Sequence, residues 1–185
     1  FSKDGTTSLA GTSFTKDGSL LAFQISEGGS DWRKVILMNA ESMEILEDTL
    51  VDIKFSGISW KGNAGFYYSS YDKPKDGSEL SGLTQFHKLF YHELGTRQTD
   101  DILVFGGDET PRRYIGGGVS EDGSFLIISA ATSTTGNELY IQDLRTDGPI
   151  VNVVDNFEND HWVIHSEGDK LFIKTNMGAP NGKVV

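Results

Sequence analysis

The chain has four histidines and no cysteine, so imidazole rings are the first candidates for metal binding or acid–base catalysis. His161 and His165 have the spacing of an HxxxH metal pair, but the surrounding segment resembles a strand. Four strand residues at about 3.3 Å each would separate them by about 13 Å, whereas zinc ligands lie about 2.0–2.1 Å from the ion. His87 and His92 would face opposite sides of a strand. We therefore expect structural roles for the first pair, no catalytic role for the second, and no metal or cofactor.

A serine nucleophile of the GxSxG type would sit at a strained turn between a strand and a helix. The two nearest matches are GISWK, centred on Ser59, and GVSED, centred on Ser120, and both lack the final glycine. The sequence therefore predicts no catalytic residue within this chain.

Glycine runs and turn acids are the remaining candidates for ligand binding. Gly116–Gly118 lack the GxGxxG spacing and a following helix, so we expect no phosphate-binding loop there. We expect these glycines instead to let strands crowd near a narrow axis. Asp17, Asn63 and Asp122 are expected to be turn residues rather than calcium ligands, because too few oxygen ligands lie near them.

The composition limits the partners. The chain has 16 Lys and Arg and 27 Asp and Glu, which give a net charge of −11. This negative charge argues against nucleic acid and anionic membranes as partners. The absence of cysteine excludes disulfides and thiolate metal sites without fixing the compartment. No apolar run approaches the roughly 18 residues of a membrane helix, and no signal peptide is recognisable. We expect a soluble protein, cytoplasmic or periplasmic.

One phrase, two apolar or aromatic runs around a glycine turn, occurs four times in the chain. The four copies are TSFTKDGSLLAFQIS, GISWKGNAGFYYSSY, GGVSEDGSFLIISAA and HWVIHSEGDKLFIKT. Their glycines 18, 65, 123 and 168 follow one another at steps of 47, 58 and 45 residues. A period of this length indicates repeated structural units.

Each repeat contains about four short strands, which is typical of β-propeller blades. The runs LLAFQI and FLIIS are nearly continuous and should be buried on both faces. A sandwich or a barrel would explain the strands but not the recurrence. The sequence thus predicts an all-β propeller fragment of about three and a half four-stranded blades. Their expected ranges are 12–56, 57–105 (with a polar loop at 72–85), 114–154 and, for the half-blade, 160–176.

The phrases GSDW (29–32), KFSGISW (54–60), LFYHELGT (89–96) and VSEDG (119–123) resemble, in the same order, the propeller of the prolyl oligopeptidase family. These serine peptidases cleave short peptides after proline. The resemblance covers essentially the whole chain. It implies a seven-bladed propeller that caps an α/β-hydrolase domain, a partner that carries the catalytic triad and is absent from this chain.

The resemblance also implies a substrate-binding role for three residues. Phe55 matches the aromatic residue of the family's KFS phrase. Tyr114 and Ser133 match two further positions at the far end of the substrate pocket, where relatives carry Met and Cys.

Three functions follow as alternatives. The first is a non-catalytic propeller fragment that gates the access of short proline-containing peptides and is inactive by itself. The second is a free-standing propeller that serves as a protein-binding scaffold, and the third, with the least support, is a small enzyme. We also expect that the sequence is a piece of a longer one. Because an incomplete propeller leaves sheet edges exposed, we expect copies to self-associate, for example as a pair.

Overall fold

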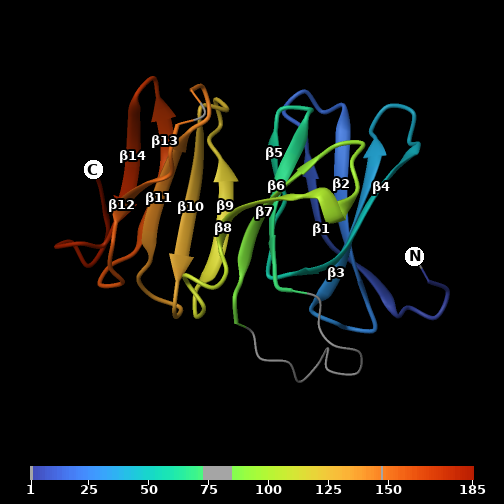
Figure 1. Cartoon of the computed structure of the whole chain (residues 1–185), viewed down its shortest axis with the longest axis horizontal. Coiled ribbons are helices and arrows are strands. Elements are labelled where there is room, and N and C mark those ends of the chain that lie inside the picture. Colours follow the sequence, from blue (N-terminus) through green and yellow to red (C-terminus); the bar gives the residue numbers. More distant parts are fainter. Residues whose placement is uncertain (1, 73–84, 147) are drawn as a thin grey trace. The chain divides into compact units, whose positions relative to one another are not determined.

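The computed structural model describes residues 2–72, 85–146 and 148–185, and its architecture is all-β (Figure 1). Most of the polar loop expected at 72–85 lies outside the described residues. The chain divides into two compact units, Phe1–Pro111 and Arg112–Val185. Each unit contains two antiparallel sheets whose strands follow one another in chain order, as the repeats predict. No helix among the described residues is long and apolar enough to cross a membrane.

The first unit contains two four-stranded sheets and one short 3-10 turn, η1 (Gln98–Asp100). The first sheet consists of β1 (Thr7–Phe14), β2 (Leu20–Glu27), β3 (Trp32–Asn39) and β4 (Ile45–Lys54). The second consists of β5 (Ser59–Lys61), β6 (Gly65–Ser70), β7 (Lys88–Glu93) and β8 (Ile102–Gly106).

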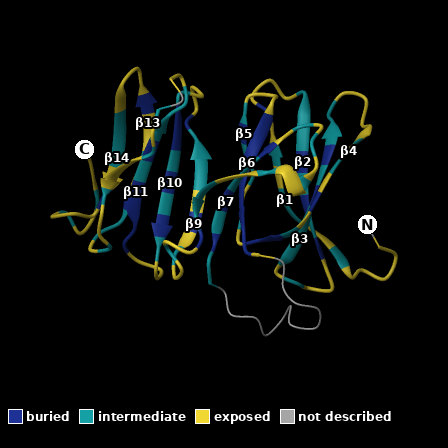
Figure 2. Ribbon diagram, viewed as in Figure 1, coloured by how far each residue is buried: buried dark blue, intermediate teal, exposed yellow. Residues whose placement is uncertain are grey.

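The core of the first unit lies between its two sheets. It consists of buried aliphatic side chains from the first sheet and aromatic side chains from the second: Ala22, Val35, Leu37, Leu50, Ile53, Trp60, Phe66 and Tyr68. All six residues of β6 are buried (Figure 2). Trp60 also donates its indole N–H to the carbonyl of Ser13, at 3.1 Å. The two sheets are therefore joined by apolar packing and by a side-chain hydrogen bond.

The second unit repeats this arrangement with one four-stranded and one three-stranded sheet. The strands of the former are β9 (Tyr114–Val119), β10 (Phe125–Ala131), β11 (Glu138–Asp143) and β12 (Val151–Val154). The strands of the latter are β13 (His161–Glu167), β14 (Lys170–Thr175) and β15 (Lys183–Val184). β15 is one strand more than the two that the sequence predicts.

Two strands are longer than the sequence pattern suggests. β1 starts at Thr7 and not at 12, and its small and polar first half contains a register shift between Leu9 and Gly11. β4 starts at Ile45. Alternate residues in its first half are exposed, and charged residues there interrupt the apolar pattern by which a strand is recognised. In both cases polar residues on a solvent-facing side hide the strand from a search for apolar runs.

The turn glycine of the second repeat is Gly62 and not Gly65. Gly62 has a positive φ of 58°, as Gly18, Gly123 and Gly168 do in their own hairpins. Gly65 lies within β6, where a Cβ would collide with the backbone carbonyl of His92. Gly65 is therefore required for close approach of two strands, whereas Gly62 makes the turn.

Candidate functional site

Phe55 follows the last residue of β4 and has an unusual backbone conformation. Its φ is +55°, and Asp52, three residues earlier, has a φ of +57°. A β-bulge precedes it, because Arg33 and Val35 of β3 pair with Ile53 and Leu50 and leave two residues of β4 opposite one. Positive φ is a genuine outlier for a bulky side chain. Such strain persists only where the surroundings enforce it.

Hydrogen bonds from the second sheet hold this segment on both sides of Phe55. Ser70 donates its hydroxyl to the carbonyl of Asp52 at 2.5 Å, and Ser56 accepts the backbone N–H of Ser69 at 2.7 Å. Between them, His87 Nε2 lies 3.1 Å from the carbonyl oxygen of Lys54. A carbonyl can only accept, so the proton is on Nε2 of that ring. These three bonds explain how a strained conformation is maintained.

His87 is buried, and burial lowers its pKa to about 4, partly offset by the hydrogen bond to Lys54. The imidazole is therefore neutral at pH 7. Its ring lies against that of Tyr71, with centroids 4.4 Å apart. Tyr71 in turn meets the ring of Phe55 edge-on at 6.2 Å. His87 thus supports Phe55 through the backbone and through an aromatic neighbour.

A cation completes the surroundings of Phe55. The ammonium of Lys54 lies 5.1 Å from the ring centroids of both Phe55 and Trp32, within the range of cation–π attraction. The Asp31 carboxylate is 4.0 Å from the same ammonium. The Phe55 side chain nevertheless remains accessible, with an exposed fraction of 47%. The result is a fixed aromatic surface that a ligand can reach.

Tyr114 and Ser133 belong to the second unit. Tyr114 starts β9 and pairs with Ala131, the last residue of β10, and Ser133 follows two residues later. The two residues therefore lie at the same end of one sheet. Both are exposed, and the Ser133 hydroxyl donates to the carbonyl of Thr135 at 3.0 Å. Phe55 belongs to the other unit.

The residues considered for other chemistry have structural roles. His161 is buried and receives a hydrogen bond from Asn137, whose side-chain amide contacts its backbone carbonyl at 3.0 Å, while His165 packs against Phe172. No cluster among the described residues could hold a metal ion. The hydroxyl of Ser120 donates to Asp122 at 2.6 Å within a hairpin turn. Ser120 is therefore a turn residue between two strands, and this turn is not the strand-to-helix turn of a nucleophile elbow.

The turn acids behave as expected from the sequence. Asp17 and Asp122 occupy equivalent turns, in which the carboxylate accepts a hydroxyl two residues before it and a backbone N–H two residues after it. These hydrogen bonds lower the pKa of both carboxyl groups. Asn63 joins its turn to the neighbouring one by donating to Asp17 at 2.7 Å.

Among the residues that the structure describes, nothing crowds the two ends of the glycine run. A Cβ added to Gly116 or Gly118 would meet no heavy atom within 4 Å.

Sequence reasoning missed a buried polar network in the second sheet. Asp101 accepts a hydrogen bond from the Tyr68 hydroxyl and one from His92 Nδ1, each at 2.7 Å. Burial, followed by the bond to Asp101, raises the pKa of Tyr68. These residues come from two strands and a loop, so no local spacing indicates the network.

The whole chain, residues 1–185, matches the family model described as "Prolyl oligopeptidase, N-terminal beta-propeller domain". The chain is 53% identical over its full length to a prolyl endopeptidase of Elizabethkingia miricola and 33% identical to prolyl oligopeptidase A of Amanita bisporigera. It covers 26% and 27% of these two relatives. The chain therefore spans about a quarter of the length of the curated relatives it matches.

Solved structures of similar proteins share the fold. One, from a study of two prolyl endopeptidases and their inter-domain dynamics, matches 98% of this chain and 26% of its own, with a TM-score of 0.90 and 31% identity. Another is prolyl oligopeptidase B from Galerina marginata, bound to a 35mer hydrolysis and macrocyclization substrate. It matches all of this chain and 28% of its own, with a TM-score of 0.90 and 28% identity. The predicted β-propeller class is thereby confirmed.

Proposed function

This chain belongs to the prolyl oligopeptidase family as its N-terminal β-propeller domain, and we propose that it gates the access of short proline-containing peptides to a separate catalytic domain. The match of the whole chain to the family's propeller carries this proposal. In the proposal, an α/β-hydrolase domain supplies the nucleophile, and this chain supplies selection by size and part of the substrate pocket.

Gating is tested in the full-length protein with two substrates that share one cleavage sequence, one a short peptide and the other a folded protein. We expect cleavage of the peptide alone. Equal cleavage of both would contradict gating. The 185-residue chain should neither hydrolyse the peptide nor react with a serine-hydrolase probe. Labelling of the chain that disappears with a single serine substitution would show instead that it is an enzyme.

Within this function, Phe55, Tyr114 and Ser133 are proposed to contact the peptide. The strongest support concerns Phe55. Its ring is half-exposed, and its backbone has a positive φ in a segment that three hydrogen bonds tie to β6 and His87. Phe55→Ala should raise KM for the peptide in the full-length protein and leave kcat nearly unchanged, since binding is lost equally in the ground and transition states. Ile102→Ala, on the outer strand β8, is the control and should change neither constant. An unchanged KM in Phe55→Ala would exclude the proposed contact.

We also propose that isolated copies of the chain self-associate. The three-stranded sheet leaves large apolar side chains exposed, namely Trp162, Ile164 and Val184. Apolar surface of this kind is normally covered in a soluble assembly. Light scattering should detect dimers or larger species at tens of micromolar, and a monodisperse monomer would contradict self-association.

A further inference from the structure

β4 is the last strand of the first sheet, so one of its sides has no neighbouring strand. At ten residues it is also the longest strand among the described residues. Four residues in its first seven, Ile45, Glu47, Thr49 and Val51, are exposed. A long free edge can pair with an extended segment of another chain unless something blocks it.

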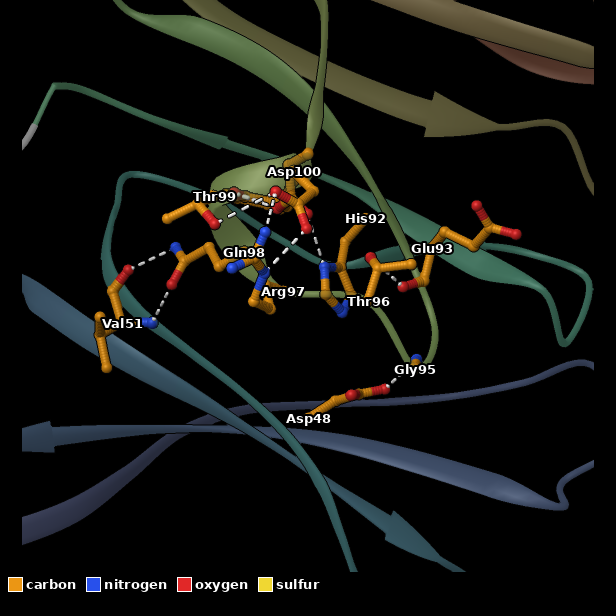
Figure 3. A network of polar contacts seen from close by, with 12 residues as sticks. Asp48, Val51, His92, Glu93, Gly95, Thr96, Arg97, Gln98, Thr99 and Asp100 are labelled. Atoms are coloured by element: carbon orange, nitrogen blue, oxygen red, sulfur yellow. Dashed lines mark hydrogen bonds and ion pairs between the residues drawn. The ribbon is translucent and has the colours of Figure 1, made fainter.

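The connection between β7 and β8, Leu94–Asp101, crosses this edge and is called the strap here (Figure 3). The side-chain amide of Gln98 bonds to both backbone groups of Val51. Its Oε1 accepts the Val51 N–H at 3.0 Å, and its Nε2 donates to the Val51 carbonyl at 2.8 Å. An adjacent antiparallel strand would satisfy the same two groups in the same way. Gln98 thus replaces a fifth strand at this point.

A second attachment lies three residues earlier on β4. The backbone N–H of Gly95 donates to the Asp48 carboxylate at 2.7 Å (Figure 3). The strap therefore contacts the edge at two points, one through a side chain of the strap and one through a side chain of the strand.

The strap has its own internal order. The Thr96 hydroxyl donates to the carbonyl of Glu93 at 2.8 Å, and a 3-10 turn spans Gln98–Asp100. The Arg97 guanidinium bonds to both carboxylate oxygens of Asp100, at 3.0 and 3.1 Å. This pair raises the pKa of Arg97 and lowers that of Asp100. A pre-ordered strap loses less entropy when it holds Gln98 against the edge.

The end of the strap is anchored in the core. The Asp101 side chain is 2% exposed and that of His92 is 1% exposed. Asp101 bonds to His92 and to Tyr68, so withdrawing it would leave two buried donors without their acceptor. The C-terminal end of the strap is thus held by a buried anchor, whereas the bonds between Gln98 and Val51 are exposed.

We propose that the strap seals the free edge of β4 and that Gln98 prevents this edge from pairing with a strand of a second copy of the chain. Gln98 is suited to this role because its amide presents a donor and an acceptor at the spacing of a peptide group. The segment blocked is an extended one, since only such a segment could offer the same pair of bonds to Val51.

The test replaces Gln98 in the full-length protein and follows the exchange of the Val51 amide by hydrogen–deuterium exchange mass spectrometry. Gln98→Met keeps the length of the side chain and removes both bonds. It should speed exchange at Val51 by roughly fivefold, because a hydrogen bond contributes about 1 kcal/mol. Gln98→Glu keeps an acceptor for the Val51 N–H and should speed exchange less. Thr99→Ala, in the same turn without a bond to β4, is the control.

Association is the second readout. Gln98→Met should associate more strongly with itself than Thr99→Ala does in sedimentation at matched concentrations. Unchanged exchange at Val51 in Gln98→Met, or equal acceleration in Thr99→Ala, would overturn the proposal. Faster exchange without stronger association would also overturn it, because the edge would then be open and still unable to pair. If Gln98→Met does not fold, Asp48→Asn, which weakens the other attachment, is subjected to the same two measurements and the same criteria.

Discussion

Replacing Phe55 by glycine is expected to be less destabilising than replacing it by alanine. Both substitutions remove the ring and its contacts with Tyr71 and Lys54. Only glycine relieves the positive φ of +55° at this position. The difference between the two variants therefore isolates the backbone strain from the loss of side-chain contacts.

The left-handed conformation costs an L-residue about 1–2 kcal/mol. A glycine lowers the unfolding free energy by about 0.5–1 kcal/mol relative to alanine, because it gives the unfolded chain more conformational freedom. The two terms oppose each other, so Phe55→Gly should be more stable than Phe55→Ala by about 1 kcal/mol. For a chain of 185 residues, that corresponds to a Tm higher by about 2–4 °C.

The matched control is Val153 in β12, whose side chain is 49% exposed, close to the value for Phe55, and whose φ is not positive. There the sign should reverse, and Val153→Gly should be less stable than Val153→Ala by about 0.5–1 kcal/mol. Urea unfolding of all four variants measures the two differences. If glycine is the less stable choice at both sites by a similar amount, position 55 stores no strain and the argument for a pre-organised Phe55 fails.

Three further predictions concern the two units separately. The unfolding free energy should fall by up to about 3 kcal/mol as pH is lowered from 7 toward 4, because the pKa of His87 is about 4 in the folded state and near 6.5 in the unfolded state. In urea titrations at a series of pH values, His87→Phe should make the unfolding free energy less dependent on pH in this range. Gly65→Ala should cost about 1–3 kcal/mol in thermal unfolding, because its Cβ would strike a carbonyl of β7, whereas Gly116→Ala should cost little. Arg113→Ala should cost about 3–5 kcal/mol, since it strands the buried Glu138 carboxylate, and adding Glu138→Leu should recover part of that loss in a double-mutant cycle.

Acidification destabilises the folded state through His87. The folded His87 stays neutral because burial lowers its pKa, whereas the unfolded imidazole takes up a proton below about pH 6.5. Protons therefore bind the unfolded state preferentially between about pH 6.5 and the folded pKa of about 4. The stabilisation by neutral His87 is complete above this window and is lost as pH falls through it. A slope that is identical with and without His87 would show that other groups cause the acid sensitivity.

The strand order could be predicted from the sequence because it depends on local patterns. The S/T-x-D-G turns that place Asp17 and Asp122 bring the same hydrogen bonds wherever they occur, and the apolar runs after them are strands. The strand starts at Thr7 and Ile45 were missed because solvent-facing residues interrupt the apolar pattern. Local rules thus give the number and order of strands better than their ends.

The candidate site could be located by sequence only through family resemblance. The positive φ of Phe55 accompanies a bulge in β4 and bonds from neighbouring residues of β4 to Ser70 of β6 and to His87, which directly precedes β7. Phenylalanine has no preference for that conformation, so no propensity rule would predict it. The bond between His92 and Asp101 joins side chains of a strand and a loop, so no local sequence pattern indicates it either.

Among the described residues, the side-chain amides of Asn137 and Gln98 make the same pair of backbone bonds, and their burial predicts different consequences. Asn137 binds the N–H and the carbonyl of His161 and is buried, whereas Gln98 binds those of Val51 at an exposed edge. Removing Asn137 leaves buried backbone groups unsatisfied, which costs about 1–3 kcal/mol for each group. Removing Gln98 lets water replace its bonds, so the loss in unfolding free energy should be small. Removing Asn137 should therefore cost more unfolding free energy than removing Gln98, whose loss is detected most directly by exchange at Val51 and by association.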